Sequence, residues 1–266
     1  MTMASTAVLV ATRNRSELLR QRTVPSIIHQ ELAPSVVLVV NDGDAFPAAV
    51  CDALASIAGI ASLQVLANER APGPAGAWNT GLQWLRDQGF DGFVAILDDD
   101  DTWDPQHLAV NLRAASGAGA AVAVSGLRLH INGRLEPRPL LERLAVSDFL
   151  VGNPGWQGSN TFVRLAALEA IGGFDEQLPS MHDRDLAVRL LRYPGTSWVL
   201  VPEWTATWFF GTPGCLTGRS ESKLVALRRF LAKHHVLMGA EERAAYFERA
   251  QRLFGFTQAA IECRPD

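Results

Sequence analysis

Four consecutive aspartates at positions 98–101 are the residues of this sequence best suited to bind a cation. They directly follow an apolar run at residues 93–97, which is typical of a buried strand. Four neighbouring carboxylates repel one another unless a cation lies among them, and ligands that are all oxygen favour Mg²⁺ or Mn²⁺ shared with substrate phosphates. The alternative is a solvated acidic loop before a helix near Pro105, with Asp104 as the helix cap. The residue types favour the cation site.

Three other acids, Asp42, Asp183 and Asp185, could each have either a chemical role or an ordinary structural role. Asp42 follows an apolar run at residues 36–40. A carboxylate there can accept a hydrogen bond from a nucleobase or a ribose hydroxyl, but Asp42-Gly43 is also a good turn sequence. Asp183 and Asp185 begin a predicted helix, and acids in a first turn are favoured by the helix dipole. The residues by themselves do not decide between these roles.

Strand-like and helix-like segments alternate over the first 130 residues, which predicts an α/β fold. Strands are predicted at residues 8–10, 36–40, 63–66, 93–97 and 121–124, and helices at residues 16–29, 47–58, 76–88 and 105–115. Such alternation predicts a mostly parallel sheet flanked by helices, with ligands beyond the carboxyl ends of the strands. The acids at positions 42 and 98–101 both lie at that edge.

The pattern changes after residue 125. An alternating run at residues 127–131 leads into Asn132-Gly133, which is a strong hairpin signal. Residues 211–222 are small and polar and are predicted to form a mobile loop. His234 and His235 lie on a predicted helix and are interpreted as ordinary surface or packing residues. The remaining predictions are strands at residues 161–163 and 198–201, helices at 165–171 and 183–192, and helical structure from residue 222 onward.

Composition excludes several classes of protein. The 266 residues carry a net charge of −4, which argues against a general nucleic-acid binder. Three widely spaced cysteines predict neither a disulfide framework nor a zinc site. No apolar run approaches the length of a membrane span, and the apolar run at residues 7–11 lacks the preceding basic residues of a secretory signal. We therefore expect a cytoplasmic protein without a membrane span, and the sequence leaves a homodimer open.

Six short motifs occur in one order along residues 6–210. They are Ala11-Thr12-Arg13-Asn14-Arg15, Val40-Asn41-Asp42-Gly43, Asn79-Thr80-Gly81, Leu97-Asp98-Asp99-Asp100-Asp101, Gly172-Gly173-Phe174-Asp175 and His182-Asp183-Arg184-Asp185-Leu186. Each motif is weak alone, but the ordered set resembles the family-2 glycosyltransferases of the GT-A fold, which use nucleotide-diphosphate sugars. The resemblance implies a catalytic domain at residues 1–215, divided into a nucleotide-sugar half at 1–125 and an acceptor half at 126–215. Residues 216–266 are then expected to be a helical extension of the same domain.

The resemblance also implies which residues bind the donor. Asp42 would contact the base within a nucleoside pocket, and the other donor-binding residues would be Thr12, Arg13, Asn14, Asn79, Asp98 and Asp99. The aspartate run corresponds to the DxD motif of the family, with Asp98 and Asp100 as its two acids. Asp100 and Asp101 would bind Mn²⁺ or Mg²⁺, which would bridge to the donor diphosphate and offset charge on the leaving nucleotide.

For the acceptor side, the resemblance implies that Asp183 is the general base of an inverting transfer. It would take the proton from the acceptor nucleophile as that atom attacks the sugar. The acceptor itself is undetermined and could be a saccharide, a glycolipid or a natural product. Residues expected to contact the acceptor are Trp156, Ser159, Asn160, His182 and Asp185.

The sequence departs from the family pattern at three places. Trp78 stands where an Arg is common, so that Arg70 or Arg13 would have to supply a cation for the diphosphate. His182 replaces the usual Glu before the base. The family often has a metal-binding His after the last strand of the sheet, and Thr207-Trp208-Phe209-Phe210 contains none.

Two other functions remain open on this sequence. A GT-A-like nucleotidyltransferase would make a nucleotide sugar, but it normally has a glycine-rich basic loop after its first strand, and residues 11–15 lack glycine. A catalytically inactive nucleotide-sugar-binding module would fit the departures at Trp78 and at the absent histidine. The glycosyltransferase remains the favoured prediction.

Overall fold

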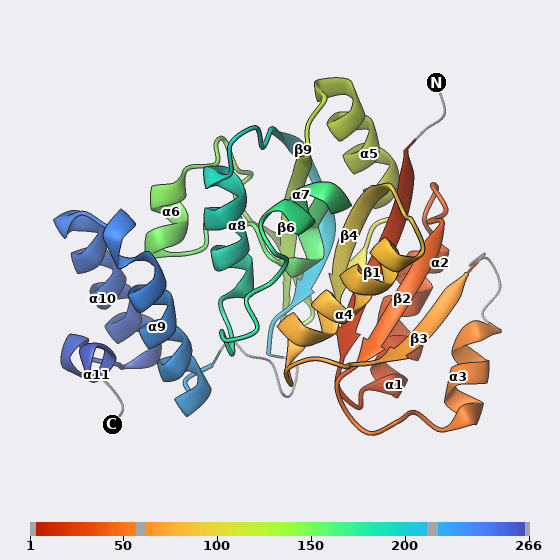
Figure 1. Ribbon diagram of the computed structural model, residues 1–266, viewed down its shortest axis with the longest axis horizontal. Coiled ribbons are helices and arrows are strands. Elements are labelled where there is room, and N and C mark those ends of the chain that lie inside the picture. The colour runs from red at the N-terminus through yellow and green to blue at the C-terminus, as the bar shows by residue number, and fades with distance from the viewer. Residues whose placement is uncertain (1–3, 57–61, 212–217, 264–266) are drawn as a thin grey trace.

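The computed structural model describes residues 4–56, 62–211 and 218–263. Within these residues one sheet has the strand order β3-β2-β1-β4-β8-β6-β9-β5, and β7 pairs with β6 (Figure 1). The strands are β1 (Ser5–Thr12), β2 (Val36–Asn41), β3 (Leu63–Ala67), β4 (Gly92–Asp98), β5 (Thr102–Trp103), β6 (Val122–Ile131), β7 (Arg134–Pro137), β8 (Thr161–Arg164) and β9 (Trp198–Phe209).

Most strands of the sheet run in one direction. β1 pairs in parallel with β2 and β4, β2 pairs in parallel with β3, and β6 pairs in parallel with β9. β8 lies antiparallel between β4 and β6, while β5 and β7 are antiparallel additions to β9 and β6. The predicted α/β class with a mostly parallel sheet flanked by helices is therefore confirmed, as is the hairpin at Asn132-Gly133.

Successive residues of the central strands point into two different cores, because side chains alternate between the faces of a strand. Leu9 and Leu38 face one core, which also contains residues of α4 (Pro74–Asp87) and α8 (His182–Arg192). Val8 and Val37 face the other core, which contains residues of α2 (Val24–Ile28) and α5 (His107–Ala118). Burial on both faces explains why these strands are continuous apolar runs in the sequence.

The predicted helix at residues 16–29 is present but is not a uniform α-helix. It consists of α1 (Ser16–Leu18), a π-helical segment η1 (Leu19–Thr23) and α2. The other helices are α3 (Ala48–Ala55), α6 (Val146–Val151), η2 (Gly158–Asn160), α7 (Leu165–Ala170), α9 (Glu221–His234), η3 (His235–Leu237), α10 (Ala240–Phe254) and α11 (Gln258–Glu262).

The last three α-helices lie beside α6 and α8, at the opposite end of the molecule from β3 (Figure 1). Phe230 of α9 and Tyr246 of α10 are fully buried and join the same core as Leu186 of α8. Through this packing the C-terminal helices share the hydrophobic core beside α8. Of the mobile loop predicted at residues 211–222, residues 212–217 lie outside the described residues.

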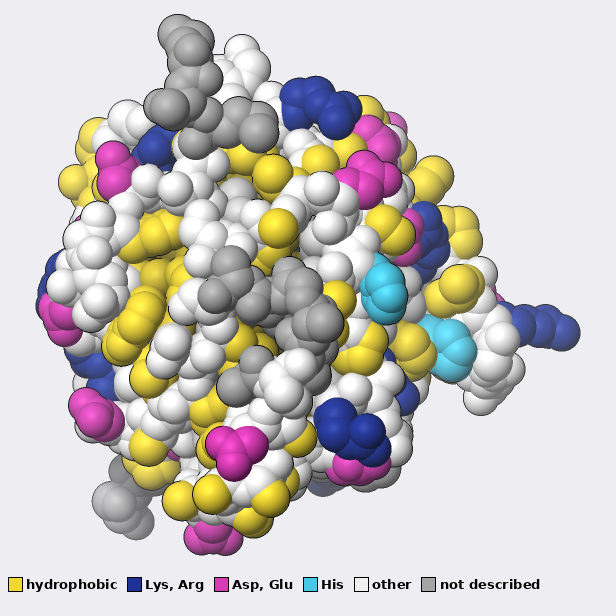
Figure 2. All heavy atoms as spheres, turned by 90° about the vertical axis from the view of Figure 1, so that its right-hand side faces the viewer, with side chains coloured by type: hydrophobic (Ala, Val, Ile, Leu, Met, Phe, Trp, Pro, Cys, Tyr) yellow, Lys and Arg dark blue, Asp and Glu magenta, His cyan; other side chains and the backbone are white. Residues whose placement is uncertain are grey.

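On the face seen in Figure 2, acidic and basic side chains are interspersed among apolar ones. Along the described residues, no helix combines the length and the apolar character needed to cross a membrane.

Candidate active site

The carboxyl ends of three neighbouring strands bring the predicted donor-binding residues together. In the sheet register Thr12 of β1 lies opposite Asn41 of β2, and Ala11 lies opposite Asp98 of β4. The loops that follow β1, β2 and β4 therefore begin at the same edge. This edge is where open α/β sheets bind ligands.

Two of the four carboxylates in the acidic loop, those of Asp99 and Asp101, accept hydrogen bonds from other parts of the chain. Asp99 accepts hydrogen bonds from the hydroxyl of Thr12 at 2.6 Å and from the guanidinium of Arg15 at 2.8 Å. Asp98 and Asp100 are partly exposed, whereas Asp99 and Asp101 are buried. The backbone N–H of Asp101 donates to the carbonyl of Asp98 at 3.1 Å, which holds the loop in a tight turn. The turn leaves Asp98 and Asp100 as the carboxylates accessible to a ligand.

Asp101 does not have the surroundings predicted for a metal ligand. Its side chain accepts from Ser159 Oγ at 2.5 Å and from the backbone N–H of Phe209 at 2.9 Å, and the residue is only 1% exposed. Each carboxylate oxygen of Asp101 thus accepts one hydrogen bond from the protein. The structure therefore assigns Asp101 to tying the loop to η2 and β9, because these contacts come from residues far away in the sequence.

The four aspartates of the acidic loop carry more negative charge than the neighbouring cations neutralise. Burial, together with the charges of the other three aspartates of the run and of Asp183, raises the pKa of Asp98 well above its usual range. Burial and Asp99 also raise the pKa of Asp100, against the opposing charge of Arg15. Burial and Asp100 raise the pKa of Asp101 to about 7. Each of these shifts shows that a positive charge placed in the loop would be stabilised.

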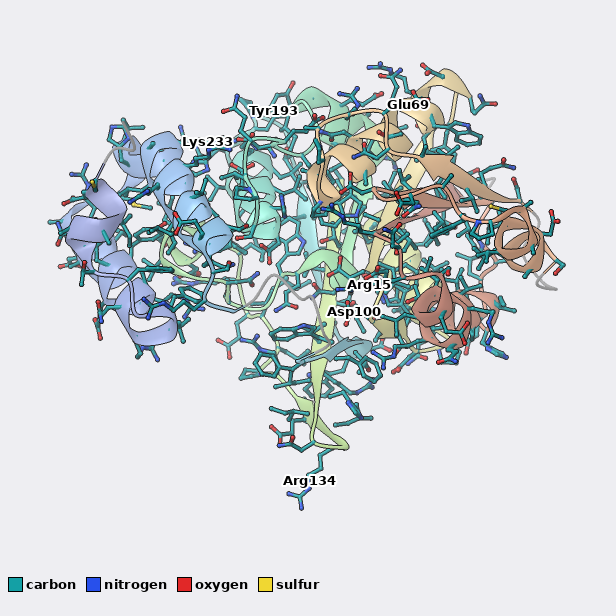
Figure 3. The ribbon with its side chains drawn as sticks, turned by 90° about the horizontal axis from the view of Figure 1, so that it is seen from below. Arg15, Glu69, Asp100, Arg134, Tyr193 and Lys233 are labelled. Carbon is teal, nitrogen blue, oxygen red and sulfur yellow. The ribbon has the colours of Figure 1, made fainter. Side chains whose placement is uncertain are left out.

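The cations beside this loop are different from those that the sequence suggested. Arg15 lies 3.5 Å from Asp100 in addition to its contact with Asp99, and Figure 3 shows Arg15 and Asp100 next to each other. Arg22 donates to the backbone carbonyl of Asp100 at 2.8 Å. Arg13 is largely exposed and lies 4.0 Å from Asp42, which is a long ion pair. Arg70 pairs with Glu176 at 3.2 Å. Arg15 and Arg22 are therefore the cations in contact with the acidic loop.

Asp42 is held rigidly at the end of β2. Its carboxylate accepts from the side-chain nitrogen of Asn68 at 2.5 Å and from the backbone N–H of Gly73 at 2.8 Å. Asn14 is exposed beside it and adopts a left-handed backbone conformation with φ of 57°. Gly73, which lies directly before α4, thus helps to orient the acid predicted to contact the base.

Asn79 has a structural role in place of the predicted donor contact. Its side-chain nitrogen donates to the carbonyl of Phe174 and to Glu176, each at 2.8 Å, and its oxygen accepts from the N–H of Phe174. The neighbouring Trp78 packs on Phe174, with ring centroids 4.6 Å apart, and meets His182 edge-on at 5.5 Å. Trp78 and Asn79 therefore join α4 to the segment before α8, because the side-chain amide of Asn79 has its hydrogen-bond partners in that segment.

Asp183, the predicted base, is positioned from two sides in the first turn of α8. Its carboxylate accepts from the side-chain nitrogen of Asn153 at 2.5 Å and from the N–H of Arg184 at 2.8 Å. The preceding Met181 has a left-handed φ of 69°, which is uncommon for a residue with a side chain. Strained residues of this kind cluster at functional sites. Burial and the other aspartates, and after them the charge of Asp183, raise the pKa of Asp98.

The structure buries the residues that were predicted to contact the acceptor. Trp156, Ser159, Asn160 and Asp185 have no exposed surface, and His182 is 6% exposed. Trp156 donates from its indole to Thr161, Asn160 donates to two backbone carbonyls, and His182 hydrogen-bonds the carbonyl of Leu178. These buried side chains stabilise the protein around the site and have almost no surface that an acceptor could contact.

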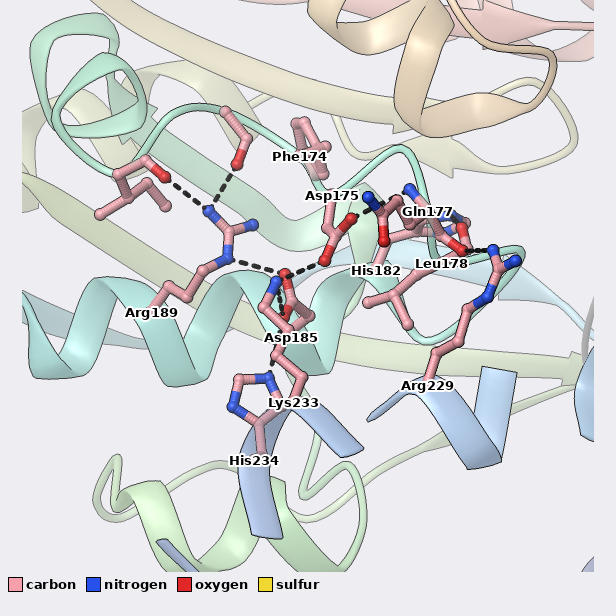
Figure 4. Close-up of polar contacts among 12 residues, drawn as sticks. Phe174, Asp175, Gln177, Leu178, His182, Asp185, Arg189, Arg229, Lys233 and His234 are labelled. Carbon is pink, nitrogen blue, oxygen red and sulfur yellow. Dashed lines mark hydrogen bonds and ion pairs between the residues drawn. The ribbon is translucent and has the colours of Figure 1, made fainter. Parts of the chain in front are cut away.

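Asp185 lies at the centre of an ion network between α8 and α9 (Figure 4). It contacts Arg189 and Lys233 at 2.7 Å and His234 at 2.8 Å. Burial by itself would raise the pKa of Asp185, but the hydrogen bond from His234 and the charges of Arg189 and Lys233 hold this pKa below its usual range. His234 is thus a packing residue, as interpreted from the sequence, with Asp185 as its partner.

Sequence reasoning missed Asn153 as the partner of Asp183 and Gly158 as the neighbour of Asp98. A Cβ on Gly158 would lie 2.7 Å from a carboxylate oxygen of Asp98, so only glycine leaves room for that side chain. Both residues belong to the segment between α6 and β8. Its composition, with Asn, Pro and three Gly in residues 152–158, was the available signal of a loop built for close approach.

Comparison with known proteins agrees with this arrangement. Residues 7–170 match the family model described as Glycosyl transferase family 2. Two proteins of Rhizobium meliloti (strain 1021) are similar over part of the chain: succinoglycan biosynthesis protein ExoW, 34% identical over 107 residues, and succinoglycan biosynthesis protein ExoO, 35% identical over 111 residues. Each match covers 40% of this chain, but only 32% of ExoW and 28% of ExoO.

Solved structures show the same fold. The crystal structure of S. aureus TarS 1–349 in complex with UDP-GlcNAc superposes with a TM-score of 0.68 at 19% identity, covering 96% of this chain and 74% of that one. Another crystal structure of S. aureus TarS gives a TM-score of 0.64, with 44% of that chain covered. The fold and the order of the strand-end loops thus agree with the family model, which matches more than half of the sequence. The chain belongs to glycosyl transferase family 2.

Proposed function

We propose that this chain is a metal-dependent, inverting glycosyltransferase that moves a sugar from a nucleoside diphosphate donor to an acceptor nucleophile. The observation that carries the proposal is that one short segment contacts both Asp98 and Asp183: Asn153 donates to Asp183, and the carboxylate of Asp98 lies against Gly158. Besides burial and the adjacent aspartates, the charge of Asp183 raises the pKa of Asp98. Acids that hold a cation to which a diphosphate can bind, together with a carboxylate that can take a proton, are what transfer from a nucleotide sugar requires. Membership of the family and the UDP-GlcNAc complex of TarS support the same function.

The nucleoside would lie at the ends of β1 and β2. Asp42 is oriented there by Asn68 and by the N–H of Gly73, and each of its carboxylate oxygens retains a lone pair for a base N–H. Arg13 and Asn14, which are exposed in the adjacent loop, are available to the ribose and the diphosphate. Thr12 contributes indirectly, because its hydroxyl is bound to Asp99.

Mn²⁺ or Mg²⁺ would be held by Asp100 with Asp98 beside it. Among residues 4–56, 62–211 and 218–263, no group of three His, Cys, Asp or Glu side chains could hold a metal by itself. This fits a cation that uses one or two carboxylates and completes its shell with substrate phosphates and water. The raised pKa values of Asp98 and Asp100, caused first by burial, indicate the same need for a cation. When bound, such an ion offsets negative charge on the departing diphosphate.

Asp183 would act as the base. The acceptor nucleophile forms a bond to C1 of the sugar as the bond between C1 and the diphosphate oxygen breaks, and Asp183 takes the proton from the nucleophile. Asn153 and the N–H of Arg184 fix the carboxylate so that it faces the acceptor. Attack from the side opposite the leaving group inverts the anomeric centre, and no covalent sugar–enzyme intermediate forms.

The proposal is tested by donor binding and donor hydrolysis. UDP-, GDP- and dTDP-sugars are screened by thermal shift with and without Mn²⁺, and release of the nucleoside diphosphate is followed without an acceptor. We expect one nucleotide class to stabilise the protein only with the metal, and Asp100→Asn to lose both the shift and the hydrolysis. Asp91→Asn, at the exposed opposite end of β4, is the matched control and should behave as the wild type.

Two outcomes would overturn the proposal. Full donor binding and hydrolysis by Asp100→Asn would remove the metal from the mechanism. Release of pyrophosphate from a nucleoside triphosphate and a sugar phosphate, without hydrolysis of any nucleotide sugar, would identify a nucleotidyltransferase instead.

A further inference from the structure

A cavity of about 500 Å³ lies between α6 and α10, away from the edge where the donor would bind. Its walls include Val151, Gly152 and Asn153 at the end of α6, and Glu241, Ala245 and Arg249 on α10. α6 and α10 pack against each other, so the cavity is a feature of their contact and not of one loop. None of these residues was singled out in the sequence.

The cavity adjoins the predicted base through one residue. Asn153 lines it and also donates the hydrogen bond of 2.5 Å to Asp183. A molecule in the cavity would therefore lie next to the residue that positions Asp183. This position is suited to an acceptor and not to the donor nucleotide.

Arg249 is the cation of this cavity, and it makes no hydrogen bond or ion pair with the described part of the chain. Its guanidinium lies against Gly152, where an added Cβ would be 3.1 Å from both Cζ and Nε. The carbonyls of α6 that could have bound it, those of Phe149 and Leu150, accept instead from Arg184 at 2.9 and 2.8 Å. The N–H donors of Arg249 are consequently available to a ligand.

The acids that line the cavity do not neutralise Arg249. Asp148 pairs with Arg143 at 3.3 Å, Glu242 accepts from the N–H of Gly239 at 2.9 Å, and Glu241 is exposed to solvent. Burial, and after it the charges of Arg252 and Arg138, lower the pKa of Arg249. None of the three lining acids is paired with Arg249, and the charges that act on its guanidinium are those of Arg252 and Arg138.

From this geometry we infer that the cavity between α6 and α10 is an acceptor subsite in which Arg249 binds an anionic group, a carboxylate or a phosphate, of the acceptor. This inference rests on the proposed function, since it assigns the cavity to the acceptor of that reaction. A planar guanidinium with free N–H donors is suited to either oxyanion. Gly152 leaves the space in which the guanidinium lies.

The test compares pairs of small probes that differ in charge. Dissociation constants are measured by NMR titration for methyl β-D-glucuronide against methyl β-D-glucoside, and for glycerol 1-phosphate against glycerol, with the full chain. We expect at least one anion to bind about tenfold or more tightly than its neutral partner, as for a charge-assisted hydrogen bond. The pair that shows the preference tells whether the group is a carboxylate or a phosphate.

Variants assign the preference to Arg249. Arg249→Gln should abolish it, Arg249→Lys should keep part of it, and Arg252→Gln, a neighbouring exposed arginine of α10, should retain most of it. Thermal unfolding shows whether each variant is folded. Equal binding of charged and neutral probes, failure of both anions to bind, or a preference that persists in Arg249→Gln would overturn the inference.

Acceptor-independent hydrolysis of the donor separates this inference from the proposed function. Hydrolysis should be the same in the wild type and in all three variants, because Arg249 is remote from the donor loops. If the wild type hydrolyses no nucleotide sugar but still binds an anion through Arg249, the transferase proposal fails and the anion site stands. If hydrolysis is normal and no anion binds, only the acceptor subsite is wrong.

Discussion

Asn153 donates a hydrogen bond of 2.5 Å to Asp183, and this contact ties the segment after α6 to the first turn of α8. The same segment continues to Gly158, against which the carboxylate of Asp98 lies. One short stretch of chain therefore touches both carboxylates on which the proposed reaction depends. Its conformation sets how far the acidic loop is from the base.

Asp183→Asn should stop transfer while leaving donor binding intact. The amide cannot take a proton, so we expect the rate of transfer to fall about 10²–10⁴-fold, the usual contribution of a general base. Donor affinity in the presence of Mn²⁺ is measured in parallel by calorimetry. Asp175→Asn, at a half-buried carboxylate that pairs with Lys233, serves as the control. Transfer within a few fold of the wild type would show that the base lies elsewhere.

Asn153→Ala should lower kcat with little change in the KM for the donor. The variant leaves Asp183 with the backbone N–H of Arg184 as its remaining partner, and a misplaced catalytic group costs up to about 100-fold. In Asn153→Asp, a second carboxylate beside Asp183 should raise the pKa of the base and move the acidic limb of the pH–rate profile to higher pH. An unchanged profile would mean that Asn153 does not position the base.

Arg15→Gln should reduce stability and weaken donor binding. Asp99 and Asp100 lose a cation at 2.8 and 3.5 Å, and we expect a decrease in the free energy of unfolding of about 1–3 kcal/mol, typical of a lost charged hydrogen bond. Denaturant titration measures this change. Arg13→Gln, whose side chain is mostly exposed, should change stability by no more than about 0.5 kcal/mol.

Stabilisation by Mn²⁺ should increase as the pH rises from about 5 to about 8. Burial and Asp100 raise the pKa of Asp101 to about 7, and burial and neighbouring acids raise that of Asp98, so the folded state binds protons that the unfolded state has released. The stability due to these groups is therefore lost as the pH rises from the unfolded to the folded pKa. A bound cation offsets that loss.

The measurement is the difference in Tm with and without Mn²⁺ at each pH. Burial lowers the pKa of His107 to about 3, which has the opposite pH dependence but is present both with and without the metal. The difference in Tm therefore isolates the acidic loop. A difference that is independent of pH, or that is retained in Asp100→Asn, would contradict the prediction.

Asp185→Asn should destabilise the contact between α8 and α9. Asp185 has no exposed surface and contacts three basic side chains, and of these Lys233 alone keeps a second carboxylate partner among the described residues, Asp175. We expect the free energy of unfolding to fall by about 3–5 kcal/mol, as for a broken buried ion pair. Asp175→Asn, which removes only the outer partner of Lys233, should cost no more than about 1 kcal/mol.

The α/β architecture and the edge of the sheet where the site lies could both be predicted from patterns in the sequence. Apolar runs such as residues 36–40 and 93–97 indicate strands buried on both faces, and this signal is local to each run. The acids that follow these runs lie at the carboxyl ends, so Asp42 and Asp98 could be placed at one edge from the sequence. The order of the motifs was also sufficient to predict the family.

Which side chains of these motifs are free to bind a ligand depends on contacts that form only in the folded chain. Asp101 is occupied by Ser159 and Phe209, and Asp99 by Thr12 and Arg15, all of them distant in the sequence. Whether a carboxylate is free or bound depends on such long-range contacts, which leave no periodic pattern in a single sequence. The roles of Asn153 and Arg249 have the same origin, because each depends on two helices that meet only in the folded chain.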